Sequence, residues 1–286
     1  MTIAAHSFKG KRVAVFGLGR SGNATVDALL RGGADVLAWD DAPAAAEQAA
    51  EHGLPVVNLH GVDFATLDSF VLSPGVPLTH PEPHWSVKKA RACGVEIIGD
   101  TEILVRELAG SGARLVAITG TNGKSTTTAL VGHVLASAGL DVAVGGNIGT
   151  AALLLPPPAE TGIYVIELSS YQIDLMPSLK PDVGILMNLS PDHLERHGDM
   201  QHYAGVKARM FALQGPEDLA VISLDDEWCA DIATKAAGHT SVASFSVAAK
   251  NASVKSDGDT VTDARDGTSV PLRRARALRG LHNAQN

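Results

Sequence analysis

The stretch AITGTNGKSTTTAL, residues 117–130, limits the fold of this chain more than any other. A short apolar run leads into Gly120, and Gly123, Lys124 and Ser125 open a helix-forming run. A strand, a glycine-rich loop and a helix in this order are typical of a phosphate-binding loop, where backbone N–H groups and the helix N-terminus surround phosphate oxygens. The lysine can reach the β- and γ-phosphates and the serine hydroxyl can bind Mg²⁺. The stretch therefore predicts a nucleoside triphosphate site.

The loop is shorter than the usual form. The usual loop has a glycine six positions before its lysine, where this chain has Ile118, and the motif here reads TGTNGKST over 119–126. A purely structural role for these glycines is the alternative. We expect the ATP-binding residues of the loop to be Gly120, Thr121, Asn122, Gly123, Lys124, Ser125 and Thr126.

Short β-rich runs alternate with helical stretches along the first hundred residues. Strands are expected over 12–16, 35–39 and 69–73, with helices between them, and a helix over 99–108 leads out of this region. Strand–helix–strand units at this spacing predict a mostly parallel sheet. We expect a Rossmann-like α/β domain over 1–108.

The pattern then restarts, which predicts a second domain, as a length of 286 residues also favours. A helix over 199–213 carries four apolar residues on one face, namely Tyr203, Val206, Met210 and Leu213. Strands are expected at 114–119, 164–168, 183–188, 219–223 and 241–246, with a weaker β region over 252–270. We expect a P-loop ATPase-type α/β domain over 109–278.

The segment GLGRSG is a second glycine motif, with Gly17, Gly19 and Gly22 in G-x-G-x-x-G spacing between a predicted strand and a helix. Such glycines permit a close approach of backbone N–H groups to a diphosphate. Asp40 ends the second strand, near the position from which an acidic side chain contacts a ribose hydroxyl. We expect a bound nucleotide diphosphate, although the motif does not distinguish NAD from a nucleotide sugar. The alternative is a glycine turn needed only for helix–sheet packing.

Three further side chains are expected near the phosphate loop. Glu167 ends a predicted apolar strand, and His193 follows the next strand in NLSPDHLERHG, residues 188–198. Because ligands of parallel α/β sheets gather at the carboxyl ends of strands, both are placed to hold a metal that bridges nucleotide phosphates. Mg²⁺ prefers oxygen ligands, so the alternative for His193 is a loop histidine that caps the next turn. Lys207 lies beside the apolar helix face, where the alternative is a lysine that extends to solvent.

The composition excludes several classes of protein. A net charge of −8 argues against nucleic acid as a partner. The two cysteines, Cys93 and Cys229, have no metal-binding spacing, so we expect no disulfide framework and a reducing cytoplasm. No apolar run approaches the ~18 residues of a membrane span, and the N-terminus has no signal-peptide pattern. We expect a cytoplasmic monomer without membrane insertion.

Six segments together resemble the Mur ligase family. They are TGTNGKST (119–126), GGNIGT (145–150), ELSSYQ (167–172), NLSPDHLERHG (188–198), YAGVKARMF (203–211) and LRGLHNAQN (278–286). The resemblance implies an ATP-dependent amide ligase of peptidoglycan precursor synthesis. Among its members, VFGLGRSG, WDD and SPGVP most resemble those that add D-glutamate to UDP-N-acetylmuramoyl-L-alanine. There, ATP converts the substrate carboxylate to an acyl phosphate, the amine attacks it, and ADP and phosphate leave.

The resemblance also implies roles for individual residues. Lys124 would stabilise the migrating phosphoryl group, and Ser125 and Glu167 would hold a first Mg²⁺. His193 would help to hold a second Mg²⁺, for which Lys207 matches the lysine that the family carbamylates into an oxygen ligand. The residues implied near the adenine are Asn283 and Asn286. Those implied at the UDP substrate are Gly19, Arg20, Ser21, Gly22, Asp40, Ser73, Pro74, Gly75, Asn147, Ser169 and His193.

The family has three domains, and the sequence stops inside LHNAQN, where a connector to the third begins. We expect 279–286 to be the start of this connector. The third domain carries most of the D-glutamate site. We therefore expect the present chain of 286 residues, on its own, to bind nucleotides and to ligate poorly. The alternatives are another Mur-type ligase, a folylpolyglutamate-like ligase, a non-catalytic nucleotide-binding fragment, and an NAD-binding regulatory module fused to an ATPase switch.

Overall fold

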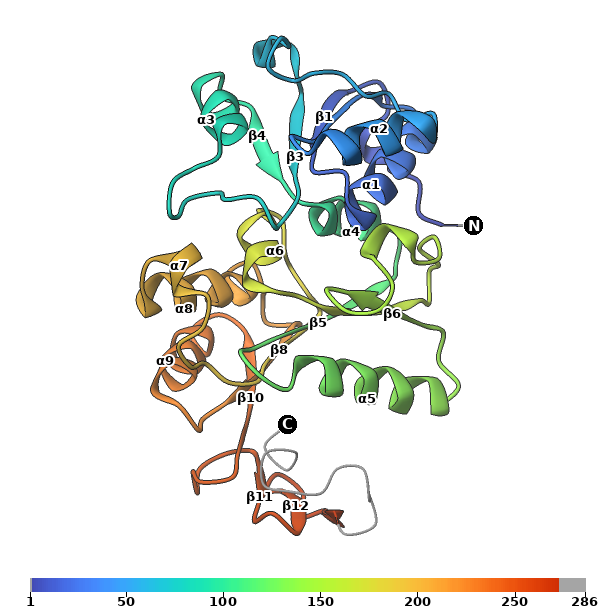
Figure 1. The fold of residues 1–286 in the computed structure, drawn as a ribbon. Helices are drawn as coiled ribbons and strands as arrows, with labels where there is room; N and C mark the ends of the chain where they lie inside the picture. Colours follow the sequence, from blue (N-terminus) through green and yellow to red (C-terminus); the bar gives the residue numbers. More distant parts are fainter. Residues whose placement is uncertain (1, 273–286) are drawn as a thin grey trace.

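Two β-sheets organise the chain, and the phosphate loop opens from the second one (Figure 1). The computed structural model describes residues 2–272. Within them the first sheet has the order β2-β1-β3-β4, and the second has the order β13-β12-β11-β10-β9-β8-β5-β7-β6. The prediction of two successive α/β units is confirmed.

The first sheet is parallel throughout, as its strand–helix alternation predicts. Its strands are β1 (Arg12–Phe16), β2 (Asp35–Trp39), β3 (Ser69–Leu72) and β4 (Glu96–Ile98). Its helices are α1 (Arg20–Gly32), α2 (Pro43–Glu51), α3 (Trp85–Ala92) and α4 (Asp100–Leu108), with 3₁₀ turns η1 (His6–Phe8) and η2 (Phe64–Thr66). The alternation does not predict β4, because a three-residue strand carries too little pattern.

The second sheet is parallel except at its C-terminal edge. Its parallel strands are β5 (Arg114–Thr119), β6 (Val142–Gly146), β7 (Ile163–Glu167), β8 (Val183–Leu186), β9 (Leu219–Ser223), β10 (Ser241–Ser246) and β11 (Val254–Ser256). Strands β12 (Thr260–Asp263) and β13 (Ser269–Pro271) continue it in antiparallel pairing. Its helices are α5 (Lys124–Ser137), α6 (Ser170–Asp174), α7 (Leu194–His197), α8 (Met200–Ala208) and α9 (Glu227–Ala236), with 3₁₀ turns η3 (Ala152–Leu154) and η4 (Arg209–Phe211).

Strand β5 lies between β7 and β8, and this position decides where the sheet can bind a ligand. It pairs in parallel with both neighbours. Strands β7 and β6 extend the sheet on one side of β5, and β8 to β10 extend it on the other, so the strand order reverses at β5. A crevice at the carboxyl ends of strands on either side of such a reversal is the usual ligand site of open α/β sheets.

One apolar core continues from the first α/β unit into the second. Buried side chains of α4, such as Ile103 and Leu104, belong to the same cluster as Leu153 of η3 and Ile166 of β7. The buried carboxylate of Glu102 extends this contact with one polar link, because it accepts a hydrogen bond from the backbone N–H of Ser178 (3.1 Å). The two units are therefore packed against each other over apolar surface.

The predicted helix over 199–213 is shorter than expected. Helix α8 ends at Ala208, and the chain continues as the 3₁₀ turn η4. Tyr203, Val206 and Met210 are buried as predicted, but Leu213 is 50% exposed, so its assignment to the buried face is wrong. A 3₁₀ turn has three residues per turn, and it rotates the residues beyond it off the stripe that an α-helix would continue.

Cys93 and Cys229 are both free thiols. Within residues 2–272, none of the helices has the length and apolar character that a bilayer crossing needs.

We predict that Ile118→Ala lowers the free energy of unfolding by about 2–5 kcal/mol, because Ile118 is fully buried in the central strand β5. Urea titration monitored by circular dichroism measures the change. Val134→Ala is the matched control, since Val134 of α5 is 56% exposed and its loss should alter stability by less than about 0.5 kcal/mol. Equal effects of the two substitutions would contradict the assignment of β5 to the core.

Candidate functional site

The phosphate loop connects β5 to α5, and two of its glycines are required by its shape. Gly123 precedes α5 with φ of 82°, a left-handed conformation that favours glycine. A Cβ at Gly120 would lie 2.8 Å from the Cβ of Met187, so only glycine permits the close approach to the neighbouring chain. The loop therefore has the tight backbone that a phosphate cradle needs.

Hydrogen bonds fasten the phosphate loop to the segment that follows β8. The N–H groups of Thr121 and Asn122 donate to the carbonyl oxygen (2.9 Å) and side-chain oxygen (2.8 Å) of Asn188. The Thr121 hydroxyl accepts a hydrogen bond from the N–H of Ser190 (3.1 Å). The two segments that the strand order predicts to be neighbours are therefore joined directly.

The Lys124 ammonium folds back over its own loop. It donates to the carbonyl oxygens of Gly120 (3.0 Å) and Thr121 (2.8 Å). Partial burial lowers the pKa of Lys124, and the negative charge of Glu167 opposes that effect. A cation held at the mouth of the loop is placed to meet phosphate oxygens.

Glu167, at the end of β7, brings two predicted site residues together. Its side chain is 1% exposed, and its oxygens accept hydrogen bonds from the Ser125 hydroxyl (2.8 Å) and the Asn147 amide (2.8 Å). A carboxylate and a hydroxyl side by side are oxygen donors of the kind that Mg²⁺ prefers. The residues present therefore fit a magnesium ion bound through Ser125 and Glu167, with phosphate and water as its other ligands.

His193 begins α7 between two carboxylates. Its backbone has φ of 53°, and its ring is 3.4 Å from a carboxylate oxygen of Asp192 and 3.8 Å from one of Glu195. Residues 2–272 contain no group of three or more His, Cys, Asp or Glu side chains arranged to hold a metal. A second metal at His193 stays a prediction.

Lys207 is buried, so the alternative of a lysine that extends to solvent is wrong. Its side chain from α8 is 1% exposed, and its ammonium donates to the Thr119 hydroxyl (3.1 Å) and the Gly120 carbonyl oxygen (3.0 Å). Burial and then the nearby charge of Lys124 lower the pKa of Lys207 to about 7. A substantial fraction of this amine is therefore neutral and nucleophilic near pH 7.

The first-domain glycine motif makes a tight turn between β1 and α1. A Cβ at Gly22 would lie 1.8 Å from the carbonyl oxygen of Gly17, so the helix begins in contact with the turn. The carboxylate of Asp40 accepts hydrogen bonds from the N–H groups of Leu18 (2.7 Å) and Ala42 (2.8 Å). The structure thus gives Asp40 a role in holding the turn, and its contact with a ribose stays a prediction.

The segments expected to bind the UDP substrate meet at the interface of the two domains. A Cβ at Gly17 would lie 2.5 Å from that of Ser73, so the glycine turn touches the Ser73–Gly75 turn. Arg20 donates to the carbonyl oxygen of Gly149, in the loop that also carries Asn147. Ser169 has a local structural role instead. Its hydroxyl accepts a hydrogen bond from the N–H of Gln172 (3.2 Å) in a capping box at the start of α6.

Two residues near the site were not among those predicted from the sequence motifs. Asn188 holds the phosphate loop, and Asp192 interacts electrostatically with both Lys124 and Lys207. Both stand inside NLSPDHLERHG, where only the histidine has an obvious chemical role. Asn188 is the last residue of the strand expected over 183–188, and a polar residue at the carboxyl end of an apolar run is the signal that marks it.

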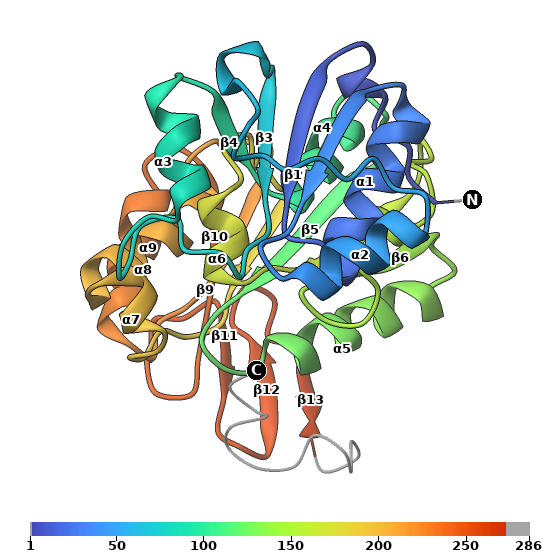
Figure 2. The same ribbon diagram turned by 45° about the horizontal axis from the view of Figure 1, so that its top comes forward.

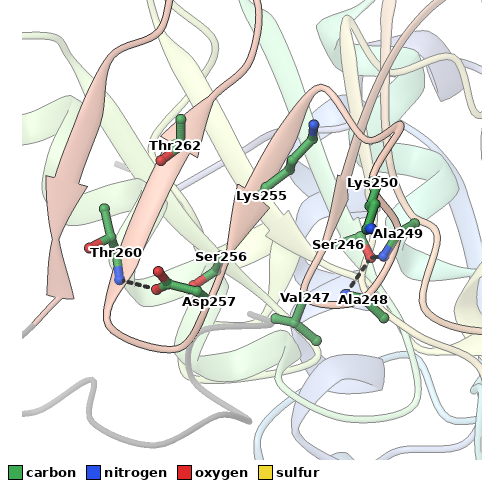
Figure 3. Close-up of a pocket in the computed structure, with 10 residues that line it drawn as sticks. All are labelled: Ser246, Val247, Ala248, Ala249, Lys250, Lys255, Ser256, Asp257, Thr260 and Thr262. Atoms are coloured by element: carbon green, nitrogen blue, oxygen red, sulfur yellow. Dashed lines mark hydrogen bonds between the residues drawn. The ribbon is translucent and has the colours of Figure 1, made fainter.

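A hollow of about 400 Å³ lies at the other end of the second sheet (Figure 3). Its wall consists of 246–250, from the end of β10 onward, and of residues in β11, β12 and the turn between them. The polar groups drawn there bond among themselves, as when the Thr260 N–H donates to Asp257 (2.8 Å) and the Ala249 N–H to the Ser246 hydroxyl (2.6 Å). None of the predicted site residues lines this hollow. Asn283 and Asn286, expected near the adenine, lie outside the described residues.

Comparison with known families decides the relationship. Residues 118–286 match the model of the Mur ligase middle domain, and residues 11–99 match that of the Mur ligase MurD-like N-terminal domain. The chain belongs to the Mur ligase family. The resemblance drawn from the six segments is confirmed.

Individual relatives carry a more specific name. This Mur ligase chain is 50% identical over 99% of its length to the UDP-N-acetylmuramoylalanine--D-glutamate ligase of Mesorhizobium japonicum, and covers 62% of it. It is 52% identical to the protein of that name from Rhizobium meliloti, over 99% of this chain and 62% of the relative. The chain thus spans about 62% of the length of these relatives.

A solved structure shows the same fold. It is the UDP-N-acetylmuramate:L-alanyl-gamma-D-glutamyl-meso-diaminopimelate ligase from Neisseria meningitides, which is 20% identical in sequence. The similarity has a TM-score of 0.59 and covers 96% of this chain and 90% of that one. At this identity the match supports the fold alone.

We predict that Lys207→Met flattens the dependence of stability on pH. From the folded pKa of about 7 to the ordinary value of 10.5, the unfolded chain holds a proton on Lys207 that the folded chain lacks, so stability rises with pH in this window. Between pH 7 and 9 the free energy of unfolding of the unchanged chain should rise more steeply than that of the variant, by up to about 1.4 kcal/mol per pH unit.

Urea titrations at pH 7, 8 and 9 measure both slopes. Lys235→Met is the control, because Lys235 is exposed and pairs only with Asp231 (2.7 Å), and its slope should match that of the unchanged chain. Identical slopes for all three proteins would show that Lys207 is protonated in the folded state.

Proposed function

We propose that this chain provides the nucleotide-binding domains of an ATP-dependent ligase that adds D-glutamate to UDP-N-acetylmuramoyl-L-alanine. The observation that carries the proposal is the hydrogen bond from Arg20, in the first-domain glycine motif, to Gly149 in the Asn147 loop. Asn147 and Ser125, at the end of the phosphate loop, both donate to Glu167. The name shared by the relatives supports the choice of substrates. Residues 1–108 are assigned to the UDP substrate and 109–278 to ATP. A cytoplasmic monomer accords with this assignment.

The reaction needs activation of a carboxylate, because a carboxylate and an amine do not form an amide in water unaided. The γ-phosphoryl group of ATP passes to the carboxylate oxygen of the substrate and gives an acyl phosphate and ADP. The amine of D-glutamate then attacks the acyl carbon, loses a proton, and the bond from carbon to the phosphate oxygen breaks. Such a step depends on positioning and on stabilisation of negative charge.

The chain's own residues fit these requirements. The amides of the phosphate loop hold the phosphate oxygens, and Lys124 faces the oxygens of the group in transfer. Ser125 and Glu167 are the residues that would hold Mg²⁺, which supplies charge neutralisation of the phosphates when bound. Asn147, which donates to Glu167, is assigned to contact the substrate.

Lys207 is assigned a covalent modification. Its neutral amine attacks carbon dioxide, loses a proton and becomes a carbamate, which replaces a cation by an anionic oxygen ligand. The burial of the side chain beside Thr119 and Gly120 lowers the pKa of the amine to about 7, so the neutral form that the reaction requires is available near pH 7. The carbamate and His193 are then the ligands proposed for a second Mg²⁺.

Four alternative functions differ from the proposal in what they require of the two domains. Another Mur-type ligase would share the ATP site and differ in the amino acid added. A folylpolyglutamate-like ligase is disfavoured because 11–99 match the MurD-like N-terminal domain. The NAD-binding alternative requires dinucleotide binding at Gly17–Gly22, and a non-catalytic fragment would bind nucleotides without an acyl acceptor.

We predict saturable binding of UDP-N-acetylmuramoyl-L-alanine to this chain in isothermal titration calorimetry, with no heat of binding for NAD in a parallel titration. The physical reason is that the glycine turn adjoins the Ser73–Gly75 turn and the Asn147 loop, which we assign to the diphosphate and the attached sugar. Binding of NAD without the muramoyl nucleotide would overturn the assignment.

We also predict a carbamate on Lys207. In ¹³C-bicarbonate buffer at about pH 7.5 the unchanged chain should give a carbamate carbonyl signal in ¹³C NMR that Lys207→Arg lacks, because a guanidinium stays protonated. Lys235→Arg is the control and should keep the signal. A signal that persists in Lys207→Arg would place the modification on another amine.

A further inference from the structure

Arg196 of α7 reaches across the domain interface to the turn that follows β3. Its guanidinium donates to the carbonyl oxygens of Gly75 (2.9 Å), Val76 (2.9 Å) and Pro74 (3.4 Å). Figures 1 and 2 both show this turn's chain segment passing beside α6 and α7. One side chain of the second domain thus holds three successive carbonyl groups of the first.

The Arg196 guanidinium also packs on an aromatic ring of its own domain. Its central carbon lies 4.7 Å from the centre of the Tyr171 ring, a cation–π contact. The next residue, His197, is buried and its ring bonds to the Ser170 hydroxyl (2.8 Å), which anchors α7 to α6. The planar fork of arginine therefore presents its donors in one orientation.

This arrangement sets the direction of one amide. The Pro74 carbonyl and the Gly75 N–H belong to one trans peptide unit and point in opposite directions. With the carbonyl held toward Arg196, the Gly75 N–H points away from it, and within residues 2–272 this N–H has no acceptor. The next amide, of Val76, is already used, because it donates to the Ser73 carbonyl oxygen (3.0 Å).

A second arginine crosses the same interface in the opposite direction. Arg20, in the glycine motif of the first domain, donates to the carbonyl oxygen of Gly149 in the second. Each domain thus donates an arginine hydrogen bond to backbone carbonyl groups of the other. Arg196 stands three residues after His193 in the sequence. The relative position of the 73–76 turn and the His193 segment is therefore set by Arg196.

We propose that Arg196 is a positioning residue for the UDP end of the substrate: it orients the 74–76 turn so that the Gly75 N–H is free to donate to a diphosphate oxygen. The role rests on the proposed function, because it takes the diphosphate as the ligand of that turn. Arg196 itself acts through the turn and does not touch the reacting atoms.

The test compares Arg196→Met and Arg196→Lys with Arg209→Met. Arg209 is the matched control, since within residues 2–272 its guanidinium donates only inside its own domain, to Asp174 (2.8 Å to the carboxylate). In calorimetry, Arg196→Met should weaken UDP-N-acetylmuramoyl-L-alanine binding by about tenfold or more, and Arg196→Lys by less, as loss of hydrogen bonds from a charged group predicts. Mg²⁺–ATP binding should change by less than about twofold in every variant, and Arg209→Met should bind the UDP substrate as the unchanged chain does.

Hydrogen exchange of the ligand-free proteins gives a second readout. The peptide that contains Val76 should exchange faster in Arg196→Met and unchanged in Arg209→Met, because only the first variant releases the turn. Unchanged exchange together with unchanged UDP-substrate affinity in Arg196→Met would overturn the role of Arg196 alone. Equal losses of ATP affinity and UDP-substrate affinity in Arg196→Met would also overturn the positioning role, because they would show that Arg196 only stabilises the domain interface. Failure of the unchanged chain to bind the UDP substrate would overturn the proposed function, and the ligand role of Arg196 with it.

Discussion

A single buried carboxylate, Glu167, connects the parts of the site. One oxygen accepts the hydroxyl of Ser125 at the start of α5, and the other accepts the amide of Asn147 from the loop after β6. A carboxylate that is 1% exposed would be costly if it lacked partners, so its two hydrogen bonds constrain the loops that provide them. The phosphate loop and the Asn147 loop are thereby held at a fixed separation around one negative charge.

The strand order supplies the remaining geometry. Ser125 and Asn188 are far apart in sequence, but β5 and β8 are hydrogen-bonded neighbours, so the segments after them begin side by side. Lys207 then approaches the same point from α8, beneath the loop, and its bonds to Thr119 and Gly120 close the base of the site. Burial and the charge of Lys124 lower the pKa of Lys207, because both disfavour a second cation, and the carboxylates of Asp192 and Glu167 oppose this effect only in part.

Much of this arrangement is visible in the sequence because it depends on local patterns. The glycine spacing, the apolar runs and the polar residue at a strand end predict the phosphate loop, the alternating α/β units and the location of Glu167. The burial of Lys207 is not visible, because a lysine beside an apolar stripe has the same local pattern whether it extends to solvent or inward. Arg196 is missed for a related reason, since its partners, the carbonyl groups of 74–76, have no sequence signature. For Leu213 the pattern predicts burial and the side chain is exposed. The helical period was continued through the 3₁₀ turn η4, which depends on tertiary packing.

The apolar cluster shared by the two domains has a consequence for how the chain can be divided. Ile103 and Leu104 of α4 pack with Leu153 and Ile166, so a chain split after residue 108 would expose apolar surface on both halves. Each half would then favour association with the other over a free existence in water. We expect two such pieces, expressed separately, to reassemble and to rebuild the turn–loop contacts of the interface.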